Sequence, residues 1–263
     1  MNWAARLARV ECPAFPARQS ARRAPTPIVL ARGDGDEIWD VDGRRYVDLT
    51  AGFGSLLLGH GHPGWSAALA AQSARLVQGL GDVYASDVKV MLLEELAALH
   101  PSPGARVLLT QSGSDAVTAA IKTAMLATGK NGIIAFDGAY HGLGYAPLPA
   151  CGFSPSFAAP FEAQLNPHVR FAPYPGLRGA TLDASLSFVG EILRGGDVGL
   201  VLVEPVLGRG GIVVPPLGFL ESLRELAHEH GALVAADEIW TGLGRAGAWR
   251  SGDDVDILCF GKG

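Results

Sequence analysis

The sequence predicts an α/β fold in which a mostly parallel sheet is covered by helices on both faces. Short, continuous apolar runs alternate along the chain with longer helical stretches, which is typical of strands buried on both sides of such a sheet. The composition agrees, since 48% of the 263 residues are hydrophobic and 18% are charged, a balance that supports a sizeable core. The 35 glycines and 17 prolines are scattered without a period, as in a turn-rich globular enzyme.

Residues 1–50 predict an N-terminal arm and a hairpin, distinct from a second domain over residues 51–263. The arm is rich in proline, which fixes φ and removes a backbone donor, so we expect it to be extended. Its prolines are Pro13, Pro16, Pro25 and Pro27. Two alternating runs in residues 37–49 flank Asp42-Gly43. This dipeptide is preferred in tight hairpin turns, so the sequence predicts a hairpin there.

Beyond the hairpin, the expected strands are short runs dominated by aliphatic residues. They span residues 106–111, 132–137, 198–204, 232–237 and 256–260. An alanine-rich stretch at residues 114–128 and a second stretch at residues 218–230 predict helices. Residues 146–178, rich in proline, phenylalanine and glycine, predict a long irregular connection.

The charge, the cysteines and the histidines argue against several classes of protein. With 21 basic and 26 acidic residues the net charge is −5, so we expect no nucleic-acid partner. No apolar stretch reaches the ~20 residues of a membrane span, and we expect no membrane contact. Cys12, Cys151 and Cys259 lack metal-ligand spacing, which favours a reducing, cytoplasmic location. His60 and His62 have no evident third ligand, so no metal site is expected.

The residues that follow each predicted strand are the candidate site, because ligands of open parallel sheets bind at the carboxyl ends of the strands. Gly113 and Ser114 begin a helix directly after the first predicted strand. Free backbone N–H groups and the helix dipole at such a start suit a phosphate. The alternative is an ordinary N-cap formed by Ser112 or Ser114.

Four further side chains follow the other predicted strands. Tyr140 lies on a glycine-flanked turn, where its ring could stack on a flat ligand or be a half-buried loop aromatic. Glu204 and Asp237 end apolar runs, and a carboxylate held there needs a partner such as a protonated ring nitrogen or a cation of the protein. Lys262, between two glycines, is either a Schiff-base nucleophile or a surface lysine.

Two glycine patterns match the dinucleotide motif G-x-G-x-x-G, at residues 59–64 and 242–247. The first has no well-formed strand before it, and the second is not followed by a helical run, although that motif requires both. The motif is thus incomplete at both places. A nicotinamide-dependent oxidoreductase that uses one of these glycine patterns is the alternative function.

The ordered set of candidate residues resembles the class III (ω-type) aminotransferases, which are fold type I enzymes dependent on pyridoxal phosphate. The resemblance extends through most of the chain from about Pro27. It is carried by residues 39–48, 58–63, 112–116, 139–142, 204–206, 237–245 and 261–263. It implies the large domain of that fold over residues 51–263, incomplete, with residues 1–50 forming part of the small domain.

The resemblance implies a role for each matching position around the cofactor. Gly113 and Ser114 would hold its phosphate, and Tyr140 would stack on its pyridine ring. Asp237 would keep the ring nitrogen protonated, and Ile239 would pack on the other face of the ring.

The remaining matches concern the reaction and the substrate. Lys262 would bond covalently to the cofactor and then carry a proton between the substrate Cα and the cofactor carbon. Glu204 resembles a carboxylate that pairs with an arginine near the substrate in several relatives, and Phe53 lies in a segment that often lines the substrate pocket. Trp240 stands where many relatives have a glutamine contacting the cofactor, and Asp115 where the family usually has glutamate.

The implied activity is transfer of an amino group from an amino-acid or amine donor to a keto acid or aldehyde. An aminomutase of the same family is an alternative. Relatives continue beyond the matching lysine and share their active site between two subunits. We therefore expect an N-terminal fragment of a longer, homodimeric enzyme, with a fragment that is not catalytic by itself as the further alternative.

Overall fold

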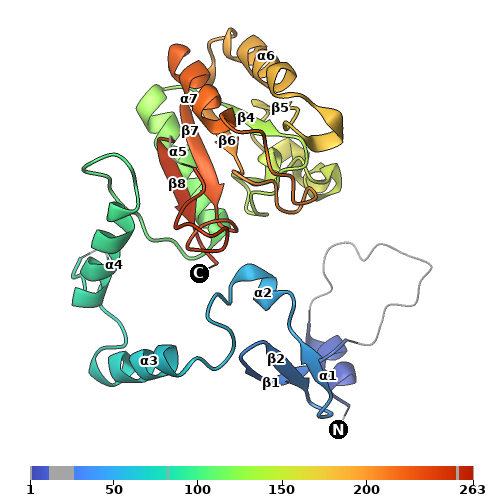
Figure 1. Ribbon diagram of the computed structural model, residues 1–263, viewed down its shortest axis with the longest axis vertical. Coiled ribbons are helices and arrows are strands. Elements are labelled where there is room, and N and C mark those ends of the chain that lie inside the picture. Colours follow the sequence, from blue (N-terminus) through green and yellow to red (C-terminus); the bar gives the residue numbers. More distant parts are fainter. Residues whose placement is uncertain (1, 12–26, 82, 253–254, 263) are drawn as a thin grey trace. The chain divides into compact units, whose positions relative to one another are not determined.

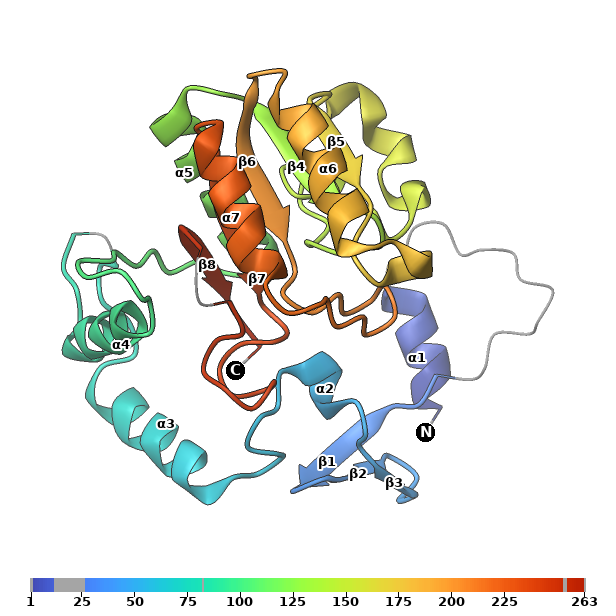
Figure 2. The ribbon, with the colours of Figure 1, turned by 45° about the horizontal axis from the view of Figure 1, so that its top comes forward.

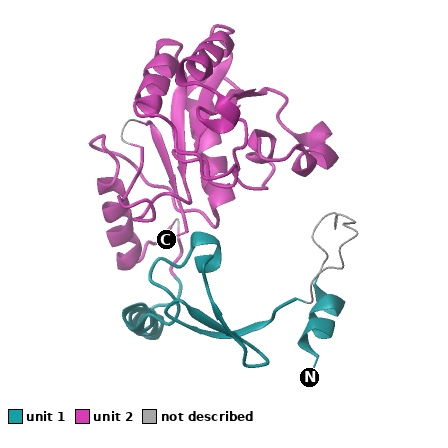
Figure 3. Ribbon diagram, turned by 45° about the vertical axis from the view of Figure 1, so that its right-hand side comes forward, with its two compact units in different colours: residues 1–78 teal, residues 79–263 magenta. Residues whose placement is uncertain are grey.

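The computed structural model describes residues 2–11, 27–81, 83–252 and 255–262, in two compact units of residues 1–78 and 79–263 (Figures 1 and 3). The predicted domain boundary after residue 50 stays a prediction. Several residues used in the sequence analysis lie outside the described part of the chain, namely Cys12, Pro13, Pro16, Pro25 and Gly263.

Unit 1 contains a small antiparallel sheet with strand order β1-β2-β3. Its elements are α1 (Trp3–Val10), β1 (Leu30–Asp34), β2 (Glu37–Asp40), β3 (Arg45–Val47), α2 (Ala51–Gly54) and α3 (Pro63–Arg75). The β2–β3 turn confirms the predicted hairpin. Asp40 Oδ1 accepts hydrogen bonds from the backbone N–H groups of Asp42 and Arg44 at 2.9 and 2.8 Å. The Tyr46 hydroxyl donates to Asp40 Oδ2 at 2.8 Å, so one buried carboxylate fixes the turn.

The glycine pattern at residues 59–64 packs against this sheet instead of opening a nucleotide site. Gly35 and His60 exchange two backbone hydrogen bonds, and His60 Nε2 lies 3.0 Å from Asp48 Oδ2. A methyl group at Gly33 would lie 2.5 Å from the His60 ring. A methyl group at Gly59 would likewise lie 2.8 Å from Gly35 O, so close packing against β1 and the turn after it accounts for glycines at positions 33 and 59 without a ligand.

Unit 2 is built on a parallel sheet with strand order β5-β4-β6-β7-β8. The strands are β4 (Gly132–Phe136), β5 (Val169–Ala172), β6 (Val198–Val203), β7 (Leu233–Glu238) and β8 (Ile257–Phe260). The helices are α4 (Asp87–Ala98), α5 (Gly113–Thr128), α6 (Leu182–Leu193) and α7 (Phe219–Glu229), with short 3₁₀ turns η1 (Leu148–Ala150), η2 (Pro155–Phe157), η3 (Ala159–Gln164) and η4 (Leu177–Gly179). Strands β4, β6, β7 and β8 and helices α5 and α7 confirm the predicted elements.

Helices cover both faces of the sheet, as predicted (Figure 2). Leu200 and Leu202 of β6 pack with buried residues of α5, whereas Val201 and Val203 pack with buried residues of α6 and α7. Successive strand residues point to opposite faces, so an entirely apolar strand is buried on both sides. This explains why β6 reads as a continuous hydrophobic run.

The predicted strand at residues 106–111 is wrong. This segment pairs with no strand in the described chain, and residues 105–110 and β8 instead line a pocket of about 320 Å³. Leu108 is consequently 72% exposed. A strand needs a neighbour for its backbone hydrogen bonds, and an apolar run alone does not provide one.

Strand β5 lies in the stretch predicted to be irregular. It is formed by parallel pairing with β4, from Ile133 opposite Val169 to Phe136 opposite Ala172. The rest of residues 146–178 is made of turns and 3₁₀ segments, as expected.

Candidate active site

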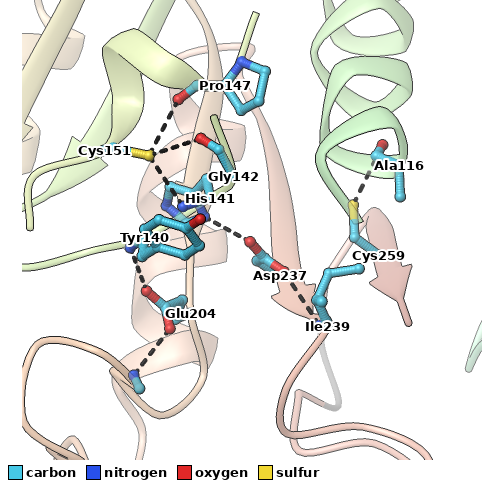
Figure 4. A network of polar contacts seen from close by, with 11 residues as sticks. Ala116, Tyr140, His141, Gly142, Pro147, Cys151, Glu204, Asp237, Ile239 and Cys259 are labelled. Atoms are coloured by element: carbon cyan, nitrogen blue, oxygen red, sulfur yellow. Dashed lines mark hydrogen bonds and ion pairs between the residues drawn. The ribbon is translucent and has the colours of Figure 1, made fainter. Parts of the chain in front are cut away.

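The candidate residues of unit 2 gather at the carboxyl ends of the parallel strands, where a ligand site is expected. Figure 4 shows the polar contacts that join the loop after β4 to the ends of β6 and β7. Helix α5 begins beside the end of β7, because Ile239 packs against Gly113. Chain segments far apart in sequence thus form one edge.

The start of α5 is capped by Ser112 and leaves two backbone donors free. Ser112 Oγ accepts from Asp115 N at 3.2 Å and donates to Asp115 Oδ2 at 2.9 Å. Within the described chain, no acceptor lies on the N–H groups of Gly113 and Ser114. Ser114 Oγ accepts from Gly144 N at 2.9 Å, which ties the helix start to the loop after β4. The N-cap alternative thus holds for Ser112, while the next two residues keep the donors that a phosphate requires.

Ile239 packs tightly between two glycines of this edge. A methyl group at Gly113 would lie 3.0 Å from Ile239 Cγ2, and one at Gly261 would lie 3.0 Å from Ile239 Cδ1. Both distances are shorter than ordinary carbon contacts, so a glycine at each position allows the close approach. The Ile239 side chain thereby brings the start of α5 next to the residue before Lys262.

Asp237 is the penultimate residue of β7, and its buried carboxylate, 5% exposed, has a partner within the protein. Its Oδ2 lies 2.7 Å from His141 Nδ1, and its Oδ1 accepts from Ile239 N at 3.2 Å. A carboxylate has about four acceptor positions, so these two bonds leave room for another donor. Asp237 can therefore keep its partner within the protein and still accept a hydrogen bond from a ligand.

His141 is the functional candidate that the sequence reasoning missed. Its side chain is fully buried, and in the described structure its Nε2 has no hydrogen-bond partner. A proton on Nδ1 can be donated to Asp237 and leaves only a lone pair unpaired at Nε2, which costs less than an unpaired N–H of a charged ring. The geometry thus favours a proton on Nδ1, directed at Asp237.

Cys151 holds the backbone on either side of the His141 ring. Its Sγ accepts from His141 N at 3.3 Å and donates to Gly142 O at 3.1 Å. Burial raises the pKa of the Cys151 thiol to about 11, so the thiol keeps the proton that it donates. The Cys151 and Cys259 thiols are both free and buried.

Glu204 joins the loops that follow β4 and β6. Its Oε1 accepts from Tyr140 N at 2.7 Å, and its Oε2 accepts from Gly208 N at 2.9 Å (Figure 4). The side chain is buried, and burial raises the pKa of its carboxyl. Both oxygens are thus bound to the backbone here, and the expected contact of Glu204 with an arginine near the substrate stays a prediction.

Tyr140 and Trp240 are half-buried at the same edge. The Arg209 guanidinium carbon lies 4.3 Å from the centroid of the Tyr140 ring. A methyl group at Gly208 would lie 2.8 Å from Trp240 Cε3, so the indole packs on the loop after β6. Stacking of Tyr140 on a cofactor, and a cofactor contact by Trp240, stay predictions.

Lys262 follows β8 and has left-handed backbone geometry, with φ of 53°. This geometry is uncommon for a residue with a side chain and occurs more often at functional sites. Lys262 directly follows Gly261, which contacts Ile239, so it lies at the same edge as the start of α5. Its covalent role stays a prediction.

The glycine pattern at residues 242–247 lies in turns and is not followed by a helix. Glu238, fully buried, holds this loop: its Oε1 accepts from Ser251 N and Gly252 N at 2.6 and 2.8 Å, and its Oε2 accepts from the Thr241 hydroxyl at 2.6 Å. The pattern therefore belongs to a fastened loop and lacks the helix start that binds a dinucleotide.

Phe53 belongs to unit 1, where it is 81% exposed and has φ of 59°. Its expected place in a substrate pocket stays a prediction. In the part of the chain that the structure describes, no group of three potential metal ligands comes together, and no helix is long and apolar enough to cross a membrane.

The parallel sheet, its two helical layers and the residues at its carboxyl edge define the large domain of a fold type I transferase. The chain belongs to the class-III aminotransferase family, whose family model matches residues 19–263.

Among curated proteins, the chain is 36% identical over 241 residues to an acetylornithine aminotransferase of Methanopyrus kandleri, covering 90% of this chain and 59% of that protein. It is 35% identical over 237 residues to a 5-aminovalerate aminotransferase of Pseudomonas aeruginosa, covering 88% and 56%. The chain thus spans less than two thirds of the length of these relatives.

Among solved structures, the chain is similar to an amine transaminase from an uncultivated Pseudomonas species in a form with bound pyridoxal phosphate. The TM-score is 0.84 at 30% identity, with 96% of this chain and 63% of that chain covered. An (S)-enantioselective ω-transaminase of Thermomicrobium roseum gives a TM-score of 0.85 at 28% identity, with 100% and 64% covered.

Proposed function

We propose that the protein binds pyridoxal phosphate at the carboxyl edge of the unit 2 sheet and transfers an amino group from a donor to a carbonyl acceptor. The observation that carries this proposal is the buried Asp237 carboxylate, which keeps acceptor positions open at an edge that also holds free backbone donors and Lys262. The bound cofactor supplies a ring that withdraws electrons from the carbon bearing the amino group.

The start of α5 fits the phosphate of this cofactor. The N–H groups of Gly113 and Ser114 are free in the described structure, and the positive end of the helix dipole adds to their attraction for an anion. Asp237 fits the opposite end of the cofactor ring. Its carboxylate can accept a hydrogen bond from a protonated ring nitrogen and is oriented by His141. Ile239 and Tyr140 provide apolar surfaces for the two faces of the ring.

Lys262 is the residue to which we assign the chemistry. Its Nζ would bond to the cofactor when no substrate is present and would carry the proton away from the substrate carbon during transfer. The names of relatives support transamination and name different substrates, since they range from acetylornithine to 5-aminovalerate aminotransferase.

The location and the assembly of the protein are part of the same proposal. We infer a homodimer from the resemblance to the family, and a cytoplasmic location from the unpaired cysteines, of which Cys151 and Cys259 are free. The partners would be a small amino donor and a carbonyl acceptor, without nucleic acid or membrane.

The test adds pyridoxal phosphate to the purified protein and records the visible absorbance, followed by borohydride reduction and mass spectrometry. We expect a visible band and a covalent adduct after reduction, both lost in Lys262→Ala. The matched control is Lys122→Ala, because Lys122 is an exposed lysine of α5. No band in the unmodified protein, or an adduct that persists in Lys262→Ala, contradicts the proposal.

An aminomutase is the second candidate, because the chain is 33% identical to a glutamate-1-semialdehyde 2,1-aminomutase of Chloroflexus aggregans. An aminomutase moves the amino group within one substrate and needs no external acceptor. Turnover that requires an added keto acid supports the transaminase, and turnover without one supports the aminomutase.

A further inference from the structure

Arg209 lies in a tight turn that follows β6. Leu207 and Val213 pair across this turn, and the backbone N–H groups of Gly211 and Ile212 both donate to Gly208 O. A turn closed by these bonds has little freedom, so the position of Arg209 is set by its backbone.

The turn is fastened to the candidate active site from two sides. Glu204 accepts from Gly208 N with one carboxylate oxygen and from Tyr140 N with the other. Trp240 packs on Gly208, where a methyl group would lie 2.8 Å from Cε3 of the indole. Arg209 thus directly follows Gly208, which is bound by Glu204 after β6 and contacted by Trp240 after β7.

The Arg209 side chain lies against two aromatic rings. Its guanidinium carbon lies 4.3 Å from the Tyr140 centroid and 5.3 Å from the Phe153 centroid, within the range of cation–π attraction. In the described chain, no carboxylate pairs with Arg209, and the neighbouring carboxylate of Glu204 is bound to the backbone. The planar guanidinium therefore keeps N–H donors free beside Tyr140, the residue whose ring we assign to stack on the cofactor.

We propose that Arg209 binds a carboxylate of the substrate, so that the preferred donors are amino acids and not simple amines. An arginine can donate two parallel hydrogen bonds to a carboxylate, and its orientation on Tyr140 reduces the entropy lost on binding. This inference rests on the proposed transamination at the same site. It names Arg209 as a specificity residue, with Glu204 and Trp240 as the groups that position it.

The experiment compares two donors that differ only in the carboxylate, 5-aminovalerate and pentylamine. With the cofactor-loaded protein, Arg209→Gln should lower kcat/KM for 5-aminovalerate about tenfold or more, and change the value for pentylamine less than about twofold. Arg209→Lys should recover part of the loss, since it keeps the charge but not the paired donors. Arg194→Gln is the matched control, because Arg194 is an exposed arginine just after the end of α6.

A second readout does not depend on turnover. Pentanoate carries the carboxylate without the amine, and its binding to the protein is measured by ligand-observed NMR. We expect binding to the unmodified protein and to Arg194→Gln, and its loss in Arg209→Gln.

Equal losses for both donors, or equal pentanoate binding with and without Arg209, overturn the inference. Absence of turnover with every donor contradicts the proposed function instead, and pentanoate binding then still decides the role of Arg209.

Discussion

Replacement of His141 separates its hydrogen bond to Asp237 from its contribution to packing. In His141→Leu, Asp237 Oδ2 loses the donor that lies 2.7 Å away, at a position where the histidine side chain is fully buried. A hydrogen bond to a charged group contributes about 1.5–3 kcal/mol. Because the same bond exists before the cofactor binds, its whole free energy is the upper limit of the change in affinity; since ~1.4 kcal/mol corresponds to a factor of ten, we expect pyridoxal phosphate to bind more weakly, by at most roughly 150-fold.

The matched variant is His141→Asn, whose side-chain amide nitrogen can take the place of Nδ1 and donate to Asp237. It also removes part of the ring, so packing is disturbed in both variants while the donor survives in only one. We expect His141→Asn to bind the cofactor closer to the unmodified protein than His141→Leu does.

The assay is a fluorescence titration with pyridoxal phosphate and with its 1-deaza analogue, in which carbon replaces the ring nitrogen. The effect of His141→Leu should be large for pyridoxal phosphate and small for the analogue, because Asp237 has no nitrogen to bind in the analogue. Equal weakening of both ligands would mean that His141 acts through packing alone and would refute this reasoning.

Three other predictions follow from contacts of this chain. Gly113→Ala should weaken cofactor binding, because its methyl group would lie 3.0 Å from Ile239 Cγ2 and 3.1 Å from Ile239 Cδ1; adding Ile239→Val, which removes Cδ1, should restore part of the affinity in the same titration. Glu238→Leu leaves two buried backbone donors without an acceptor, so urea unfolding should show a loss of about 3 kcal/mol, whereas Glu238→Gln should lose less because its amide oxygen can accept both bonds. The hydrogen bonds from His60 and Thr50 lower the pKa of Asp48 to about 2; its stabilisation is therefore present above the unfolded value of about 4 and is lost as the pH falls towards 2, and Asp48→Asn should flatten the acid unfolding curve in that window.

The parallel strands that could be predicted from the sequence are those whose runs are buried on both faces. In β6 every residue is buried, in β7 all but the first are, and both strands are free of polar side chains up to Asp237, so composition and length suffice. Residues 106–111 contain only a short apolar run, 107–109, and pair with no strand among the described residues, whereas β5 also contains an arginine, Arg170, and exists because it pairs with β4. Pairing is a property of the whole sheet and leaves no mark in a short run.

The candidate site divides in the same way. Gly113 could be found because it begins a helix that its alanine-rich sequence predicts, and Asp237 because it directly follows an apolar run. The partnership of Asp237 with His141 could not, because 96 positions separate the two residues and no periodicity links them. The only local signal is a histidine directly after Tyr140 in a glycine-flanked turn, which by itself also fits an ordinary loop.

The contact between His141 and Asp237 has a consequence for how the protein folds. The histidine follows β4, the aspartate lies one residue before the end of β7, and β6 lies between these two strands in the sheet. The pair can therefore meet only after the middle strand has taken its place. If pyridoxal phosphate is present during refolding, we expect it to bind next to His141 and Asp237 later than the helices form. The time at which the visible absorbance of the cofactor changes would then mark when β6 enters the sheet.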